Sequence, residues 1–317
     1  MRIQLNFMVG GFIFICVVIG SYAHAENRRP NILFFFADDW GRYASIYADK
    51  DKPSLNDVIS TPNIDRIGRE GVVFENAFVP VASCSPCRAS LATGRYFWNC
   101  GSNAFLNSKG SSWEGYDNPM KNLPKFGDLI RESGYYTQRS RKTFAFNPSA
   151  RPKSVRSLGT VGYERYGLYV GTADDQVERQ RRHNEIVENC RKEIQQVLAG
   201  RSQEQPFFFV FGSINTHRPY TPDSGKNLWG IEPDDLKGLL PKFLPDAHDV
   251  RRDFSDYLGE VLALDLMLGA MLEAELESSQ AAHAPGGGGD VGSALDTVKQ
   301  LYDEHLHAPP AIVDECT

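Results

Sequence analysis

Two uninterrupted apolar runs, far apart in the chain, place the strongest constraint on its fold. The first is Asn31–Ala37, directly after a proline, and the second is Pro206–Phe211. Each run is short enough to be a strand, and neither alternates polar with apolar residues as a strand with one solvated face would. Continuous apolar strands are typical of parallel sheets that are covered on both faces. We therefore expect both runs to be buried in a mainly parallel sheet.

Helix signals separate and follow these two strands. They consist of proline at a first helical position, glycine after a last one, and apolar residues close to the 3.6-residue period. The segments concerned are residues 61–70, 86–93, 123–133, 176–200 and 257–276. Short strands are also expected at Val72–Phe74 and Tyr135–Thr137. Helices that alternate with strands predict an α/β fold in which helices sandwich the sheet.

The two ends of the chain differ in composition from residues 26–280. Residues 1–25 open with Arg2, contain an apolar run and close on Ala23-His24-Ala25, the layout of a secretory signal peptide. No segment reaches the roughly 20 apolar residues of a spanning helix. We expect an exported protein, periplasmic or extracellular, without a stable membrane anchor; an uncleaved amino-terminal anchor is the alternative. Residues 281–317 begin as a Gly- and Ala-rich linker and form an atypical tail.

The overall composition excludes two classes of protein. With 41% apolar residues, the chain can fill a core and is not expected to be disordered. Its net charge of −6, with both signs interspersed, lacks the concentrated basic face of a nucleic-acid-binding protein. Cys16 lies in the predicted signal, which leaves five of the six cysteines. An odd number in an oxidising compartment leaves at least one thiol unpaired or chemically committed.

Two adjacent carboxylates, Asp38 and Asp39, follow the first apolar run. Like charges a few ångströms apart repel each other unless a cation neutralises them. One interpretation is therefore a hard divalent cation bound through oxygen. A solvated acidic turn, or a pair that caps the next helix, is the alternative. The segment Asn215–His217 follows the second apolar run, so the carboxyl ends of parallel strands can bring it to the same place.

The most specific motif is Cys84-Ser-Pro-Cys-Arg-Ala-Ser-Leu-Ala-Thr-Gly-Arg95. Two cysteines in Cys-x-x-Cys spacing at a helix start suit thiol–disulfide exchange, or a structural disulfide. Neither role needs Arg88 or the run Leu91–Arg95. The whole segment resembles the signature of the sulfatase family, in which the first cysteine is oxidised to formylglycine after translation.

The resemblance extends over residues 29–275. The further blocks that carry it are residues 29–41, 61–78, 134–142 and 206–217. It implies the alkaline-phosphatase-like α/β fold, with residues 26–280 as an N-terminal catalytic part that is incomplete at its C-terminal side. The implied activity is hydrolysis of a sulfate ester or sulfamate of a sulfated carbohydrate, and the implied partner is a formylglycine-generating enzyme. Within the family, the context of Cys84 is most similar to heparan-type N-sulfatases.

The resemblance also implies roles for individual residues. The hydrated aldehyde of formylglycine supplies the oxygen that attacks sulfur. The residues implied to act on the sulfate or the leaving oxygen are Cys84, Arg88, Lys142 and His217. The residues implied to ligate a divalent cation, Ca²⁺ or Mg²⁺, are Asp38, Asp39 and the modified Cys84.

Three departures from the family pattern qualify these expectations. Cys87 stands where a serine or another small residue is usual, and residues 141–144 lack the glycine and histidine of the family's Gly-Lys-x-His block. No Asp-Asn-Gly strand follows the helix at 257–276. We therefore expect a shortened or frameshifted sulfatase with a half-built cation site. The rival is a non-catalytic protein that binds sulfated glycans through an anion pocket of Arg88, Lys142 and His217.

Overall fold

The computed structural model describes residues 29–101, 122–142 and 165–282. The predicted signal peptide, and all but the start of the predicted tail, lie outside these residues. Within them one parallel sheet has the strand order β1–β3–β2, with β1 at Ile32–Phe35, β2 at Tyr136–Arg141 and β3 at Phe207–Gly212. The parallel sheet confirms the predicted α/β fold class.

Strand β3 is buried along its whole length because it lies between the other two strands. Its register sets Phe208 opposite Ile32 on β1 and Phe207 opposite Tyr136 on β2. All four residues of β1, by contrast, are only half-buried. The expectation that both apolar runs would be buried on both faces is wrong for β1, whose four residues stay half-buried at an edge of the described sheet.

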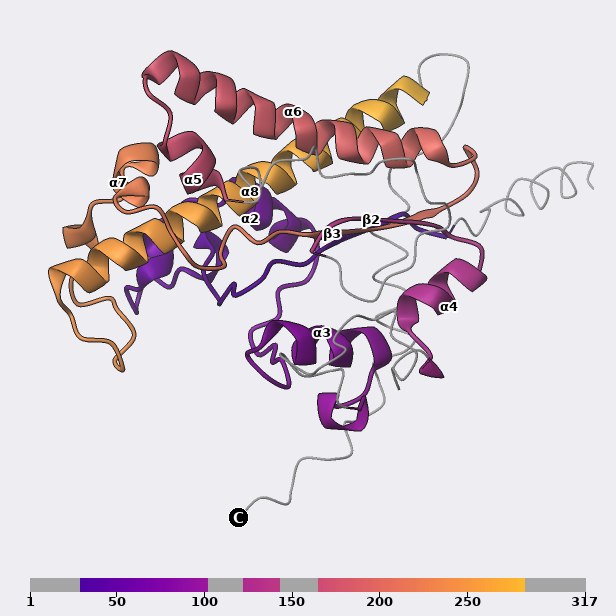
Figure 1. Cartoon of the computed structure of the whole chain (residues 1–317), viewed down its shortest axis with the longest axis horizontal. Coiled ribbons are helices and arrows are strands. Elements are labelled where there is room, and N and C mark those ends of the chain that lie inside the picture. The colour runs from indigo at the N-terminus through magenta and orange to yellow at the C-terminus, as the bar shows by residue number, and fades with distance from the viewer. Residues whose placement is uncertain (1–28, 102–121, 143–164, 283–317) are drawn as a thin grey trace, which may run out of the picture. The chain divides into compact units, whose positions relative to one another are not determined.

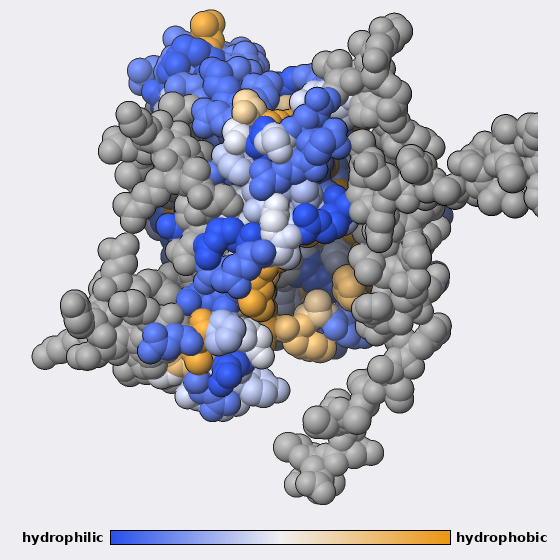
Figure 2. All heavy atoms as spheres, turned by 90° about the vertical axis from the view of Figure 1, so that its right-hand side faces the viewer, coloured by the Kyte–Doolittle hydropathy of each residue, from blue (hydrophilic) through white to orange (hydrophobic). Residues whose placement is uncertain are grey.

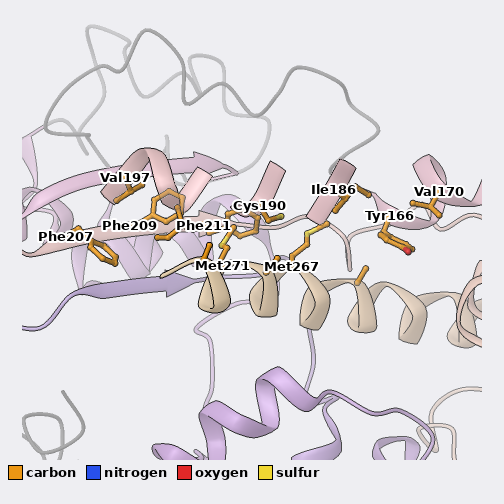
Figure 3. Close-up of a cluster of buried hydrophobic side chains, with 14 residues drawn as sticks. Tyr166, Val170, Ile186, Cys190, Val197, Phe207, Phe209, Phe211, Met267 and Met271 are labelled. Atoms are coloured by element: carbon orange, nitrogen blue, oxygen red, sulfur yellow. The ribbon is translucent and has the colours of Figure 1, made fainter. Parts of the chain in front are cut away.

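Two long helices cover one face of the sheet, as Figure 1 shows: α6 at Gln176–Gly200 and α8 at His248–Ala282. The phenylalanines Phe207, Phe209 and Phe211 alternate toward this face, because successive strand residues point to opposite sides. They form the main core cluster with side chains of both helices (Figure 3), among them Ile186, Cys190, Val197, Met267 and Met271.

The opposite face of the sheet packs on α4 at Phe126–Glu132. Here Phe208 and Val210 of β3 meet Phe126 and Ile130. Helix α3 at Cys84–Thr93 lies on the same side of the sheet as α4 (Figure 1), and it ends at Gly94, whose φ of 66° is the left-handed conformation that glycine adopts readily. Helices on both faces confirm the predicted sandwich.

The remaining described elements are short: α2 at Pro62–Glu70, α5 at Tyr166–Gly171, α7 at Ser224–Trp229 and 3-10 helices at Ser45–Tyr47, Leu55–Asp57, Phe97–Asn99 and Pro233–Leu236. Three of them begin against buried carboxylates of α8, which accept hydrogen bonds from backbone N–H groups near the helix starts. These contacts join Asp256 to Gly225 (2.8 Å), Glu260 to Gly167 (2.7 Å) and Asp265 to Ile64 (2.8 Å). Each replaces a missing intrahelical partner, so α8 fixes the starts of α7, α5 and α2.

Two predicted elements differ from the structure. Residues Val72–Phe74 form no strand: Val72 is 48% and Phe74 64% exposed, and neither belongs to the described sheet. Helix α8 also begins at His248, well before the predicted start at Tyr257, because the packing of its first turns adds to a weak sequence signal. The described atoms visible in Figure 2 are mainly hydrophilic, with apolar side chains in small areas. Among the described residues, no helix has the length and apolarity to cross a membrane.

Candidate active site at the carboxyl ends of the strands

The chain beyond β1 keeps its pairing with the chain beyond β3 and so delivers Asp38 to the edge of the sheet. The Phe36 N–H donates to the Phe211 carbonyl at 2.9 Å, and the Asp38 N–H donates to the Ser213 carbonyl at 3.0 Å. Beyond β2, the Lys142 N–H donates to the Gly212 carbonyl at 3.0 Å. Parallel strands present their carboxyl ends at one edge, so these segments meet there.

An ion cluster around the buried Asp38 carboxylate occupies this edge. It is formed by Asp38, Arg88 and Lys142 and is called the Asp38 cluster below. Asp38 is 4% exposed. Its Oδ1 accepts from Arg88 Nη2 at 2.5 Å and from Arg88 Nε at 3.2 Å, while its Oδ2 is paired with the Lys142 ammonium. Burial by itself would raise the pKa of Asp38, but hydrogen bonds from Lys142 and Arg88 and their charges hold that pKa below its ordinary value.

Arg88 joins helix α3 to both strand ends. Its guanidinium is buried, and it donates from Nη1 to the Lys142 carbonyl at 2.8 Å as well as to Asp38. It also lies over the Phe36 ring, at 4.8 Å from the centroid, a favourable cation–π geometry. A planar group with several donors can meet all three partners at once, which a lysine in the same place could not.

Cys84 opens α3, one helical turn before Arg88, so the two residues lie on the same side of the helix. Cys84 and Cys87 are both half-buried free thiols. Burial raises the pKa of Cys87, and the Arg88 charge opposes this effect only in part. A raised pKa lowers the fraction of Cys87 that is present as the reactive thiolate.

Asp39 and His217 lie at the same edge, and both side chains are more exposed than those of the Asp38 cluster. Asp39 adopts φ of 51°, and its carboxylate is 54% exposed. His217 Nε2 lies 3.9 Å from Asp39 Oδ2, and His217 Nδ1 lies 2.7 Å from the Arg218 carbonyl oxygen. Of the predicted residues acting on sulfate, the structure therefore brings Arg88 and Lys142 into direct contact with Asp38 and keeps His217 with Asp39.

The described residues do not form a complete site for a divalent cation. Among them, no three His, Cys, Asp or Glu side chains come close enough together to hold a metal ion. The Asp38 oxygens accept instead from the two cationic side chains of the Asp38 cluster. The ligand set of Asp38, Asp39 and the modified Cys84 stays a prediction from the family resemblance.

Two residues of the site were not predicted from the sequence. The Thr216 hydroxyl donates to the Asp38 carbonyl, and Gly212 ends β3 so close to β2 that a Cβ there would lie 1.9 Å from the Lys142 carbonyl oxygen. A glycine after an apolar strand is a recognisable signal of close backbone approach. The approach of residues 215–217 to Asp38 was expected from the strand ends, but the sequence carries no signal for the hydrogen bond that the Thr216 hydroxyl makes there.

Comparison with known proteins gives the family of this chain. The family model described as Sulfatase matches residues 30–280. An ulvan-active sulfatase of Formosa agariphila is 24% identical over 90% of this chain and 47% of its own length. Human N-sulphoglucosamine sulphohydrolase is 43% identical over 25% of this chain and 14% of its own length. The chain thus spans about half, or less, of the length of these curated relatives.

The fold has a counterpart among solved structures. A protein from work on the metabolism of multiple glycosaminoglycans by Bacteroides thetaiotaomicron superposes with a TM-score of 0.50 at 19% identity, covering 79% of this chain and 58% of that one. This likeness supports the α/β architecture. The family model spans most of the chain, including Cys84 and every residue of the Asp38 cluster, and the chain belongs to the sulfatase family.

Proposed function

We propose that this chain forms the catalytic N-terminal part of a hydrolase that cleaves sulfate esters or sulfamates of sulfated carbohydrates. One observation carries the proposal: two cationic side chains, Arg88 and Lys142, converge on a single carboxylate beside the helix that Cys84 opens. The Asp38 cluster therefore keeps one net positive charge. A site of this kind attracts an anion, and the amino-terminal end of α3 adds its own partial positive charge.

The exposure of each described side chain indicates the role that it can play. The Arg88 side chain is 3% exposed and holds the strand ends together, whereas the Lys142 side chain is 32% exposed and can reach a bound sulfate. His217, on the loop after β3, has a half-exposed ring that can protonate the leaving oxygen or nitrogen. Oxidation of Cys84 to formylglycine by a modifying enzyme supplies the oxygen nucleophile for sulfur.

Export and cation binding belong to the same proposal. Residues 1–25 would direct the chain to the periplasm or the exterior, where sulfated polysaccharides are found. A Ca²⁺ or Mg²⁺ ion at Asp38 and Asp39 needs oxygen ligands beyond those that the described residues bring together. The names of the relatives, an ulvan-active sulfatase and an N-sulphoglucosamine sulphohydrolase, support the carbohydrate substrate class.

Mass spectrometry of the Cys84 peptide, in protein from its native host, tests the proposal. We expect the mass of the aldehyde at Cys84, together with sulfate release from sulfated oligosaccharides. Cys84→Ala should abolish sulfate release, whereas the control Cys87→Ser, which restores the residue type usual in the family, should keep it. Finding only the Cys84 thiol, or a Cys84–Cys87 disulfide, would contradict the proposed hydrolase activity.

A second candidate is a non-catalytic binder of sulfated glycans. It is favoured by residues 141–144, which lack the glycine and histidine of the family's Gly-Lys-x-His block. Such a protein would use the net positive charge of the Asp38 cluster to hold an anion without turnover. Binding of sulfated oligosaccharides that weakens in Lys142→Ala, without any sulfate release by the unsubstituted protein, would identify this function.

A further inference from the structure

The end of β2 carries an unusual combination of backbone and side-chain features. Its last residue, Arg141, has φ of 62°, the left-handed region that a residue with a Cβ rarely adopts. Such a conformation persists where the surrounding structure determines it. In the described part of the chain, the only other non-glycine residues with positive φ are Asp39 and Asp223.

The side chain of Arg141 lies inside the protein, on the face covered by α6. It is 2% exposed and lies over the Phe211 ring, 4.6 Å from the centroid. Its Nη2 is 3.5 Å from Glu193 Oε1, and the Glu193 side chain is itself only 4% exposed. The neighbouring Ser140 hydroxyl donates to Glu193 Oε2 at 2.6 Å. One carboxylate of α6 thus holds the last two residues of β2.

The next residue in the chain is Lys142, whose ammonium pairs with Asp38. Its backbone has little room to move: the N–H donates to Gly212, and the carbonyl accepts from Arg88 Nη1. That carbonyl also lies so close to Gly212 that a Cβ could not fit between them. The turn at Arg141 therefore decides where the Lys142 side chain leaves the sheet.

We propose that Arg141 and Glu193 are a positioning pair, which holds the turn at the end of β2 so that Lys142 faces Asp38. Neither residue contacts the candidate sulfate site directly, and both act through Lys142. The pair fastens β2 to α6 on one side of the sheet, and Lys142 projects to the site at its edge. The activity readout of this inference rests on the proposed function, whereas its structural readout does not.

Chemical labelling of Lys142 by an amine-reactive reagent, followed by peptide mass spectrometry, gives the structural readout. Glu193→Gln removes the charge but keeps an oxygen for the Ser140 hydroxyl, and it should raise the labelling rate of Lys142 about fivefold by loosening its pairing with Asp38. Arg141→Gly, which suits the left-handed backbone but removes the anchor, should act in the same direction. Arg141→Lys keeps a cationic side chain, so its Lys142 labelling rate should lie between those of the unsubstituted protein and Arg141→Gly.

The matched control is Glu277→Gln. Like Glu193, Glu277 pairs with an arginine, in this case Arg191 of α6. Glu277 is exposed, however, and lies far along the chain from β2. Its substitution should leave Lys142 labelling unchanged. Circular dichroism and urea unfolding show which variants fold, and only those are compared. If Glu193→Gln does not fold, Lys142 labelling is compared between Arg141→Lys and the unsubstituted protein.

Enzyme kinetics provide the second readout. If Glu193 acts through Lys142, kcat/KM of the double variant Glu193→Gln/Lys142→Ala should equal that of Lys142→Ala. Additive losses, or unchanged Lys142 labelling in folded variants, would overturn the positioning role. Changed labelling in a protein without sulfate release would support the pair and refute the proposed function.

Discussion

At the scale of single residues, Asp38 shows how adjacent identical residues acquire different environments. Asp38 is buried and accepts from two cations, whereas Asp39 turns to solvent through a left-handed backbone. The sequence shows only an acidic pair. The burial of one member and the exposure of the other depend on Arg88 and Lys142, which are distant in the chain and reach Asp38 only in the folded protein.

Arg88 offers the sharpest residue-scale prediction. Arg88→Ala should lower the free energy of unfolding by about 3–5 kcal/mol, because it leaves buried Asp38 with one cation where it had two. It should also raise the pKa of Asp38, since one of the two groups that lower it is lost. Urea unfolding at pH 7 measures the first effect and carbon-detected NMR titration of Asp38 the second.

Arg88→Lys is the informative companion. It keeps the charge but loses the contact of Nη1 with the Lys142 carbonyl, so its loss of stability should lie between those of the unsubstituted protein and Arg88→Ala. Equal stability of Arg88→Lys and the unsubstituted protein would show that charge alone, and not the guanidinium geometry, holds the strand ends.

At the scale of elements, the site depends on how closely β2 and β3 approach each other at their ends. Gly212 closes β3 where the Lys142 carbonyl passes, and the register of the two strands sets Arg141 opposite Gly212. Successive residues of β3 point to opposite faces of the sheet, so Phe207, Phe209 and Phe211 join one core cluster and Phe208 joins the other. The strands thus place both the core and the sheet edge that carries the candidate site.

Gly212→Ala tests this close approach. A Cβ at 1.9 Å from the Lys142 carbonyl oxygen forces the backbones apart, and we expect a loss of about 3 kcal/mol in the free energy of unfolding. The control is Gly171→Ala, where the nearest atom to the new Cβ would lie at 3.5 Å. That variant should differ from the unsubstituted protein by less than about 0.5 kcal/mol. Equal effects of the two substitutions in urea unfolding would contradict the steric argument.

At the scale of the whole molecule, α8 connects elements that are far apart in the chain. Its buried Glu260 accepts from the Gly167 N–H of α5 at 2.7 Å and from Asn215 Nδ2 at 3.1 Å. Asn215 precedes Thr216, whose hydroxyl donates to the Asp38 carbonyl. Helix α8 therefore helps to position the candidate active site through Glu260, a buried carboxyl group that no local sequence pattern identifies.

Glu260 makes the stability of the whole fold depend on pH. Burial raises its pKa from 4.5 to about 7, although hydrogen bonds from Gly167 and Asn215 act in the opposite direction. The folded state therefore binds a proton more tightly than the unfolded state. The stability contributed by this group is fully present below about pH 4.5, is lost as the pH rises through about 7, and amounts to about 3 kcal/mol.

Glu260→Gln should remove this dependence. The free energy of unfolding of the variant, relative to that of the unsubstituted protein, should rise by about 3 kcal/mol between pH 4.5 and pH 8. Urea unfolding across this range measures it. A difference between Glu260→Gln and the unsubstituted protein that stays constant across this range would refute the linkage.

The sequence by itself determined several of the elements and the family. The apolar run at β3, the helix signals at α3 and α6, and the motif at Cys84 are local patterns, because periodicity, capping and a short motif each lie within a few turns of chain. The half-burial of β1 and the irregular backbone at residues 72–74 were not visible in this way. Both depend on which neighbours a segment finds in the sheet.

Only the tertiary structure decided how the candidate site is assembled. The Asp38 cluster joins residues from three separate segments, and the turn at Arg141 depends on a carboxylate of α6. Such contacts arise from the packing of a parallel sheet, whose strand ends meet at one edge however far apart they lie in the chain. The motif at Cys84 identifies the family from the sequence alone, whereas the net positive charge of the Asp38 cluster beside it depends on the fold.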